Sequence, residues 1–519
     1  MTVHEESNRV KAGAHLVAFP LPAGGHHARF VPFIKLLARN GLTITVITTT
    51  NYLARMQQAL AVEKKSLEVY RRNIRVVGVD FPPEYSEIKS DNFLTLIRAT
   101  ENLKDPVRHV MKELMRYGRT NGIDESSYSH LRLRPPVCFI SDFYLPWTQY
   151  VADEFNLPRY VFYPSTHFLS LVFSLREFDA QGRLPPKDGR PFTIPGFPPI
   201  PPSDLPKTLL QYRNAKLLDE GERSREATGV LVNTAYELES SSIDGLQEML
   251  RKEFEGNETG HAPKILTIGP LVYENFRLSG GDDQPLRERV QQAAEDDNVE
   301  CLHWLTERPE ASVLYICLGT MSTFPMQQIG EFAAGLEASG VHFLWVLKVP
   351  SSEESTASYI ATFLPEGFVE RTKDRGLIYT SWAPQLRILA NPAIGGHLTQ
   401  CGWNSITESI AMGVPMIGWP LWADHMLNRR LCVDVLDIAL SVPNTSDDAN
   451  FSESSALVGR EEIERVIRLL MEDTRGQVIK KKIEEISKIV EMATRPEGSS
   501  WKNLLHFVEE VNSLSLTNE

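Results

Sequence analysis

Residues 382–425 have the sequence WAPQLRILANPAIGGHLTQCGWNSITESIAMGVPMIGWPLWADH, and their central part, Gly395–Ser405, carries the main prediction about the fold. It is an apolar segment that turns through glycine directly into a helical pattern, as strands do in α/β proteins. Backbone N–H groups at the start of such a helix, together with the positive end of its dipole, favour a concentrated negative charge. The segment therefore predicts an α/β sheet with a phosphate-binding turn at the end of one strand.

The alternation of strands and helices continues on both sides of this segment. Apolar strands separated by helical patterns are typical of a parallel sheet covered on both faces. Before residue 300 we expect strands at 14–20, 43–49, 73–79, 136–141, 159–163, 229–233 and 264–268. After it we expect strands at 312–318, 341–347, 376–380, 396–399 and 416–419, and helices at 326–339, at 385–390, from Asn404 and from Met426. Two doubly wound α/β domains follow, with ligands expected beyond the carboxyl ends of the strands.

The predicted domain borders follow from this alternation. The first domain is expected at residues 1–270 and the second at 301–495. Residues 271–300 are polar and charged and contain Gly280-Gly281, so they predict a linker or exposed loop between the domains. A final helix is expected within 496–519.

Composition limits the classes of function. The 519 residues are 42% hydrophobic and 23% charged, which is the balance of an ordinary globular protein. The net charge of −13 argues against a nucleic-acid or anionic-membrane surface, because those partners require basic patches. Five cysteines without C-x-x-C pairs, an N-terminus without an apolar stretch and the lack of a long apolar run predict a cytoplasmic protein with reduced thiols.

Several side chains around the predicted turn suit a nucleotide diphosphate. Asn404 and Ser405 stand at the predicted helix start, where they add polar contacts to the backbone N–H groups. Glu408 has the acidic character that accepts ribose hydroxyls in dinucleotide folds. Trp382 offers a flat face for a base, and Gln385 offers an amide for the ribose.

Each of these residues also has a structural alternative. The spacing of Ser405 and Glu408 is that of a helix capping box. Trp382 and Trp403 suit a core or a turn, and Asp424 suits the N-cap of the following helix. The functional interpretation depends on all of these residues occurring together.

The whole segment resembles the donor-binding signature of the plant UDP-glycosyltransferases, which are family 1 glycosyltransferases of the GT-B fold. The resemblance implies two Rossmann-like domains facing a cleft, the first binding the acceptor and the second the UDP-sugar. It implies that Asp424 accepts hydrogen bonds from the sugar, and that the final helix packs back on the N-terminal domain. Leu318-Gly-Thr320 resembles the family's turn whose hydroxyl reaches the phosphate. The implied donor-binding residues are Thr320, Trp382, Ala383, Gln385, Gln400, Gly402, Trp403, Asn404, Ser405, Glu408, Asp424 and His425.

Three residues depart from the family pattern. Gln400 stands where the family has a histidine at the diphosphate, and its amide donates a hydrogen bond without a charge, which predicts weaker donor binding. Asn391 replaces another common histidine. His425 replaces the usual glutamine, and in the family a histidine there is associated with galactose-type donors. The sugar is therefore open between glucose and galactose.

Transfer onto a hydroxyl requires a general base, because a neutral hydroxyl is a poor nucleophile near pH 7. Pro22-Ala-Gly-Gly-His26 resembles the family motif that carries the base, which implies His26 rather than His27, although Arg29 stands where the family has proline. A predicted strand ends at Asp142, which matches the family's aspartate that orients the histidine. The structural alternative for this aspartate is a helix N-cap.

The resemblance implies an inverting UDP-glycosyltransferase. It moves a hexose, glucose first and galactose next, onto a hydroxyl of a small lipophilic acceptor such as a phenolic or flavonoid. Ser165 or Thr166 is a further candidate for a hydroxyl that reaches the sugar. The UDP-sugar is a co-substrate, no cofactor is expected, and the lack of an Asp-x-Asp motif predicts metal-independent transfer. No residue pattern specifies the oligomeric state, for which a monomer is the simplest expectation.

Two alternatives belong to other classes. A nicotinamide-dependent oxidoreductase shares the α/β alternation, but G-x-G-x-x-G follows none of the predicted strands. A catalytically quiet UDP-sugar-binding protein of the same fold is the stronger alternative, because of Gln400 and the altered surroundings of His26.

Overall fold

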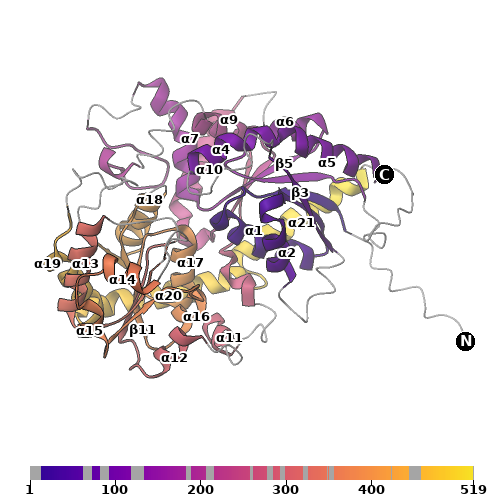
Figure 1. The fold of residues 1–519 in the computed structure, drawn as a ribbon. Helices are drawn as coiled ribbons and strands as arrows, with labels where there is room; N and C mark the ends of the chain where they lie inside the picture. Colours follow the sequence, from indigo (N-terminus) through magenta and orange to yellow (C-terminus); the bar gives the residue numbers. More distant parts are fainter. Residues whose placement is uncertain are drawn as a thin grey trace, which may run out of the picture.

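The computed structural model describes residues 13–61, 73–81, 93–117, 134–182, 189–205, 216–256, 261–276, 284–292, 299–319, 325–347, 349, 356–421, 424–442 and 457–517. Within these ranges the chain forms two parallel sheets, one in each half of the sequence (Figure 1). The first half of the chain and the second half lie beside each other, and the helices surround both sheets (Figure 1).

The first sheet has seven strands in the order β3-β2-β1-β4-β5-β6-β7. Along β1, Leu16 and Ala18 join one apolar cluster whereas Val17 and Phe19 join another. Both faces of the strand are therefore buried, as expected when successive side chains point to opposite faces of a covered sheet. The strands are β1 (His15–Phe19), β2 (Thr43–Thr49), β3 (Ile74–Val79), β4 (Cys138–Asp142), β5 (Arg159–Tyr163), β6 (Gly229–Val232) and β7 (Lys264–Thr267).

The second sheet has six strands in the order β10-β9-β8-β11-β12-β13. Every strand expected from the sequence is present, with ends that differ by at most two residues. The short β13 was not expected, because three residues are too few to give a recognisable apolar run. The strands are β8 (Val313–Cys317), β9 (His342–Val346), β10 (Gly376–Tyr379), β11 (Ile394–Thr399), β12 (Met416–Gly418) and β13 (Ala439–Ser441).

The helices that matter for the site follow the central strands. In the first half these are α1 (Gly24–Arg39), α6 (Thr148–Glu154), α7 (Thr166–Ala180) and α10 (Tyr236–Phe254). In the second half they are α16 (Gln385–Ala390), α17 (Trp403–Met412) and α18 (His425–Arg430). The others are α2 (Thr50–Ala61), α4 (Phe93–Thr100), α5 (Lys104–Tyr117), α9 (Lys216–Arg225), α11 (Leu286–Gln292), α12 (Glu300–Thr306), α13 (Met326–Ser339), α14 (Thr356–Phe363), α15 (Phe368–Thr372), α19 (Arg460–Met471), α20 (Thr474–Thr494) and α21 (Ser499–Thr517).

Part of the expected linker at 271–300 is folded and buried. A 3-10 helix at Leu271–Phe276 leads out of the first sheet, and α11 buries Leu286 and Val290. Arg287 of α11 donates to the carbonyls of Ala390 and Met412, so this helix is fixed to the second half. The prediction of an exposed loop is wrong for these residues, because the apolar positions of α11 are too few to stand out among its charges.

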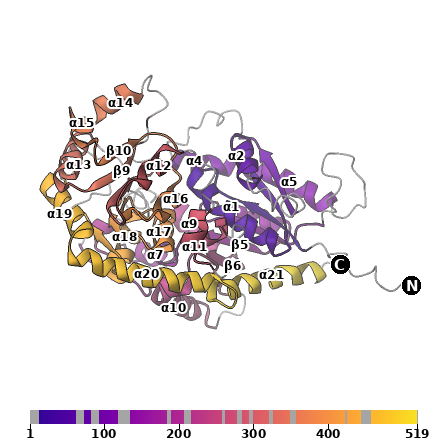
Figure 2. The ribbon, with the colours of Figure 1, turned by 90° about the horizontal axis from the view of Figure 1, so that it is seen from below.

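The last two helices run one after the other beneath both halves (Figure 2). α20 packs on α17 of the second half, and α21 packs on β7 of the first. Phe507 of α21 is buried, with its ring 4.9 Å from that of Tyr160. Asn503 reaches the carbonyl of Thr267 with its amide at 3.0 Å. A segment from the end of the sequence thus completes the core of the first half.

Both sheets reverse their strand order at one place. In the first sheet β1 lies between β2 and β4, and in the second sheet β8 lies between β9 and β11. Open α/β sheets bind ligands beyond the carboxyl ends of the strands at such switch points. His26 and Asp142 follow or end the strands at the first switch point, and Gly319 and Gln400 follow those at the second. The topology therefore directs attention to these two places.

Candidate active site

His26 and Asp142 form a buried hydrogen-bonded pair at the first switch point. His26 lies in the first turn of α1, and its Nδ1 is 2.6 Å from Oδ2 of Asp142, the last residue of β4. The second carboxylate oxygen accepts the backbone N–H of Tyr144 at 3.1 Å. These bonds hold the imidazole with Nδ1 towards the carboxylate. Asp142 closes a turn and does not act as an N-cap, because α6 begins only at Thr148.

The neighbouring His27 has different surroundings. Its Nε2 lies 3.3 Å from the hydroxyl of Thr48, and its ring packs edge-on against Tyr52 at 4.6 Å. Burial lowers the pKa of His27 to about 3, with further lowering by His26 and Arg55. A base that is so hard to protonate and contacts no carboxylate of the described residues is poorly suited to proton transfer. The geometry agrees with the choice of His26.

The turn between β11 and α17 encloses the amide of Gln400. Gly402 is the N-cap of α17, and Cys401 has a φ of +67°, which is uncommon for a residue other than glycine and typical of functional sites. A Cβ on Gly319, whose φ is +82°, would lie 2.4 Å from Gln400 Nε2. One on Gly402 would lie 3.3 Å from the same nitrogen. The turns after β8 and β11 thus converge on Gln400, where the resemblance places the diphosphate.

Gln385 connects two of the predicted ribose and phosphate contacts. Its Oε1 accepts from the hydroxyl of Tyr315 at 3.2 Å, and its Nε2 donates to Ser405 Oγ at 3.1 Å and to Glu408 Oε2 at 2.8 Å. The capping-box alternative is wrong, because α17 begins at Trp403 and the side chain of Ser405 caps no backbone group. Burial raises the pKa of Glu408 to about 7, against the opposing hydrogen bond from Gln385.

The two tryptophans of the signature have opposite environments. Trp382 is 78% exposed, so its ring has a free face, and Ala383 beside it is half-buried. Trp403 is fully buried, and its Nε1 donates to the carbonyl of Asn233 at 2.8 Å. The core alternative therefore holds for the ring of Trp403, which packs between the two halves, and its place among the donor-binding residues stays a prediction. Thr320 lies outside the described residues.

Asp424 and His425 lie at the start of α18. Asp424 occupies the N-cap position, but its side chain caps no backbone N–H, and its Oδ2 accepts from Asn428 Nδ2 at 3.0 Å. His425 is nearly buried, and burial lowers the pKa of its imidazole to about 4, opposed by Asp424 and reinforced by Arg29. His425 is therefore a neutral imidazole at physiological pH.

Arg29 connects the two switch points. It lies one helical turn after His26 on α1, and its Nε donates to Oδ1 of Asn404 at 3.1 Å. Asn404 is in the first turn of α17, so the predicted base and the predicted diphosphate turn belong to one region of the molecule. The sequence marked Arg29 only as a departure from the family pattern. The structure brings a cation to a site where Gln400 has none.

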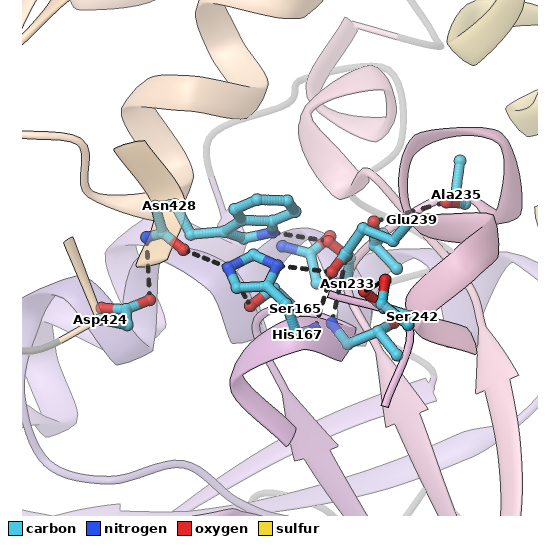
Figure 3. A network of polar contacts seen from close by, with 12 residues as sticks. Ser165, His167, Asn233, Ala235, Glu239, Ser242, Asp424 and Asn428 are labelled. Carbon is cyan, nitrogen blue, oxygen red and sulfur yellow. Dashed lines mark hydrogen bonds and ion pairs between the residues drawn. The ribbon is translucent and has the colours of Figure 1, made fainter. Parts of the chain in front are cut away.

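A second polar cluster lies where the halves meet (Figure 3). His167 Nδ1 lies 2.6 Å from Glu239 Oε1, and its Nε2 lies 2.7 Å from Asn428 Oδ1. Ser165 and Thr166 are fully buried beside it, and the expectation that one of their hydroxyls reaches the sugar stays a prediction. Sequence reasoning missed this cluster because its members come from α7, α10 and α18. The only local signal is that Asn428 follows Asp424 by one turn of a helix.

Comparisons with known proteins show what this arrangement belongs to. The family model "UDP-glucoronosyl and UDP-glucosyl transferase" matches residues 291–440. UDP-glycosyltransferase 73C10 of Barbarea vulgaris is 31% identical, with 97% of each chain covered. The chain belongs to the plant family 1 UDP-glycosyltransferases.

Solved structures of this family have the same fold. UGT71G1 of Medicago truncatula, complexed with UDP-glucose, is 28% identical with a TM-score of 0.72, and the match covers 96% of this chain and 98% of that one. UGT2 of Phytolacca americana, complexed with UDP-2fluoro-glucose and pterostilbene, is 26% identical with a TM-score of 0.74, covering 96% and 99%. This UDP-glycosyltransferase therefore has the GT-B fold and transfers a sugar from a UDP-sugar donor. No helix in the described part of the chain has the length and hydrophobicity needed to cross a bilayer.

Proposed function

We propose that this UDP-glycosyltransferase transfers a hexose, glucose in the first place and galactose next, to a hydroxyl of a small lipophilic acceptor such as a phenolic or flavonoid, with inversion at the anomeric carbon. The observation that carries the proposal is the bond of 2.6 Å between His26 Nδ1 and Asp142 Oδ2. It supports a base that is already oriented, at the same switch point at which Arg29 reaches Asn404.

In the proposed reaction His26 Nε2 takes the proton of the acceptor hydroxyl as its oxygen attacks C1 of the sugar. The bond from C1 to the diphosphate oxygen breaks on the opposite face, and UDP leaves with the bonding electrons. Asp142 stabilises the imidazolium that forms, as an aspartate does beside the histidine of serine hydrolases. The start of α17, with Asn404, Ser405 and Gln400, stabilises the charge that develops on the diphosphate, and Thr320 contributes its hydroxyl.

The proposal includes no cofactor and no metal ion. Backbone N–H groups, the amide of Gln400 and the guanidinium of Arg29 are the groups that we assign to the leaving diphosphate. Rates measured with and without a chelator test this part, because a metal-dependent transferase would lose activity in the chelator.

Residues of the second half are assigned to the rest of the donor. Trp382 stacks on the uracil ring, with Ala383 beside it, and Gln385 and Glu408 bind the ribose. Asp424 accepts hydroxyls of the sugar, and His425 beside it discriminates between sugars. Because His425 is neutral, it can donate to or accept from a sugar hydroxyl, so it discriminates between an axial and an equatorial hydroxyl by their position relative to the ring and not by charge.

The acceptor class rests on the relatives. The structure of the Phytolacca americana enzyme contains pterostilbene, which is a phenol. We assign the acceptor to the first half of the chain, because His26 and Asp142 belong to it.

The test is release of UDP by the purified protein with UDP-glucose or UDP-galactose and a panel of phenolic acceptors. Release that requires an acceptor, together with a glycoside of inverted configuration by NMR, supports the proposal. A higher kcat/KM with one donor identifies the sugar. Glycosides of retained configuration would contradict the mechanism.

The alternative of a catalytically quiet UDP-sugar-binding protein rests on the replacement of a histidine by Gln400, and the membership of the chain in a family of transferases speaks against it. Tight binding of UDP without acceptor-dependent release over the whole panel would select it.

A further inference from the structure

The buried cluster around His167 ends at the carboxylate that we assign to the sugar. Glu239 Oε1 bonds His167 Nδ1, His167 Nε2 bonds Asn428 Oδ1 at 2.7 Å, and Asn428 Nδ2 bonds Asp424 Oδ2 at 3.0 Å. Figure 3 shows these side chains in one line from α10 through α7 to α18. The first two residues belong to the first half of the chain and the last two to the second.

The orientation of the Asn428 amide follows from its neighbours. On one side the Asn428 amide nitrogen is 2.9 Å from the carbonyl of Cys401 and 3.0 Å from Asp424 Oδ2, and both of these groups only accept hydrogen bonds at neutral pH. Both hydrogens of the amide are used there, so Oδ1 faces His167. His167 must then donate from Nε2.

His167 must also donate from Nδ1. Glu239 accepts the backbone N–H groups of Thr166 and His167 at 3.1 and 2.8 Å, which favours its ionised form. Burial opposes the charge of His167, but the carboxylate of Glu239, the hydrogen bond to Asn428 and the charge of Asp424 together outweigh it and raise the pKa of the imidazole. An imidazolium donates from both nitrogens, which is the arrangement that the amide of Asn428 requires.

We propose that His167 and Asn428 are positioning residues for the donor sugar: held by Glu239, His167 fixes the amide of Asn428, which holds the Asp424 carboxylate in the orientation that accepts sugar hydroxyls. This inference rests on the proposed function, since Asp424 is assigned to the sugar there. It assigns part of the sugar site to a side chain of the opposite half of the molecule. The uracil and ribose contacts lie in other residues, whereas Asn428 Nδ2 also donates to the carbonyl of Cys401 in the diphosphate turn, so the separation between the two ligands is predicted for the His167 variants.

The proposal predicts a separation between two ligands. UDP lacks the sugar, so its binding does not use Asp424, whereas UDP-glucose does. Replacing His167 by leucine removes the donor to Asn428 Oδ1 and frees the amide to rotate. The dissociation constant of UDP-glucose should rise about five- to tenfold, as for the loss of one well-placed hydrogen bond, while that of UDP stays within about twofold.

The experiment is titration calorimetry of the full-length protein with UDP and with UDP-glucose, which needs no acceptor and no turnover. The variants are His167→Leu, His167→Gln, Asn428→Ala and the double variant His167→Leu/Asn428→Ala. Gln at position 167 retains an N–H donor and should restore part of the UDP-glucose affinity. The control is His109→Leu on the exposed face of α5, which should change neither constant.

Because His167 is buried, each variant is also checked by its thermal unfolding and by its affinity for UDP. Equal weakening of UDP and UDP-glucose in His167→Leu would overturn the proposal, since it would mean that the cluster only holds the halves together. Unchanged UDP-glucose affinity in His167→Leu would overturn it as well. If the double variant binds UDP-glucose no worse than Asn428→Ala, the two residues act along one path, whereas additive losses would contradict this. If the wild-type protein bound no UDP, the proposed function itself would fail, and this outcome is distinct from the others.

Discussion

Two buried histidine–carboxylate pairs in this molecule have almost the same local geometry but lie in different places in the fold. In each, Nδ1 of the imidazole lies 2.6 Å from a carboxylate oxygen. The His26 side chain is 10% exposed at the first switch point, whereas the His167 side chain is completely buried between the halves. A carboxylate at Nδ1 orients the ring in both. The group that Nε2 contacts then decides the role of each histidine. We assign His26 to proton transfer from the acceptor hydroxyl, and His167 to orienting the amide of Asn428.

The largest expected effect concerns the first pair. His26→Ala should lower kcat by about 10²–10⁴-fold, the usual contribution of a general base, and leave the dissociation constant of UDP nearly unchanged. Asp142→Asn should lower kcat in the same direction, because the imidazolium loses its counter-charge. The measurement is steady-state transfer beside calorimetry with UDP. If His26→Ala lowered kcat and the affinity for UDP by the same factor, the His26 pair would not have the separate role in proton transfer that we assign to it.

The second pair should matter for stability. Glu239→Ala leaves a buried imidazole and two backbone N–H groups without their acceptor, so the free energy of unfolding should fall by about 3–5 kcal/mol. Urea unfolding followed by far-UV circular dichroism measures it. Glu248→Ala on the exposed face of α10 is the matched control. A change no larger than that of the control would show that this pair is not structural.

Glu408 is a third carboxylate to compare with the two pairs. It is poorly solvated like Asp142 and Glu239, but its hydrogen-bond partner is the amide of Gln385 instead of a histidine. Its pKa is raised to about 7, and we assign the ionised form to the ribose hydroxyls. Below about pH 7 the free protein carries a proton on Glu408, which must leave when UDP binds. The affinity for UDP should therefore fall by up to tenfold for each unit by which the pH is lowered. Calorimetry between about pH 5.5 and 8.5 tests this, with Glu408→Gln reporting the slope that comes from the phosphate alone. If the affinity for UDP depended on pH equally in the wild type and in Glu408→Gln, the assignment of Glu408 to the ribose would be contradicted.

The smallest expected effect concerns the charge that the diphosphate site lacks at Gln400. If Arg29 supplies it, Arg29→Ala should weaken UDP binding by about three- to tenfold, as expected for one partly exposed charge, and Gln400→His should restore part of the loss. Uridine, which has no diphosphate, should bind the wild type and Arg29→Ala equally. Arg251→Ala removes the same charge from the exposed face of α10 and serves as the control. A matching loss of uridine affinity would assign Arg29 to packing.

The two pairs also show how far the sequence predicts the site. His26 and Asp142 follow central strands of a parallel sheet, so strand order and local motif together place them correctly. The strand-turn-helix at Gly395–Ser405 was predictable for the same reason. His167, Glu239 and Asn428 were not, because their contact depends on how two halves dock, and His167 is 261 residues from Asn428. The burial of the Trp403 ring was open for a related reason, since only the docked halves reveal it.

The last helix has a consequence for how the protein is made. Leu504, Phe507 and Val511 of α21 complete the apolar layer over the first sheet, and the backbone N–H of Ala14 donates to Asn512, 498 residues later in the chain. At typical rates of synthesis about 25–100 s separate these two residues on the ribosome. During that time the nascent first half exposes the apolar strip that α21 later covers. Folding of this half during translation therefore ends only after the second half has emerged.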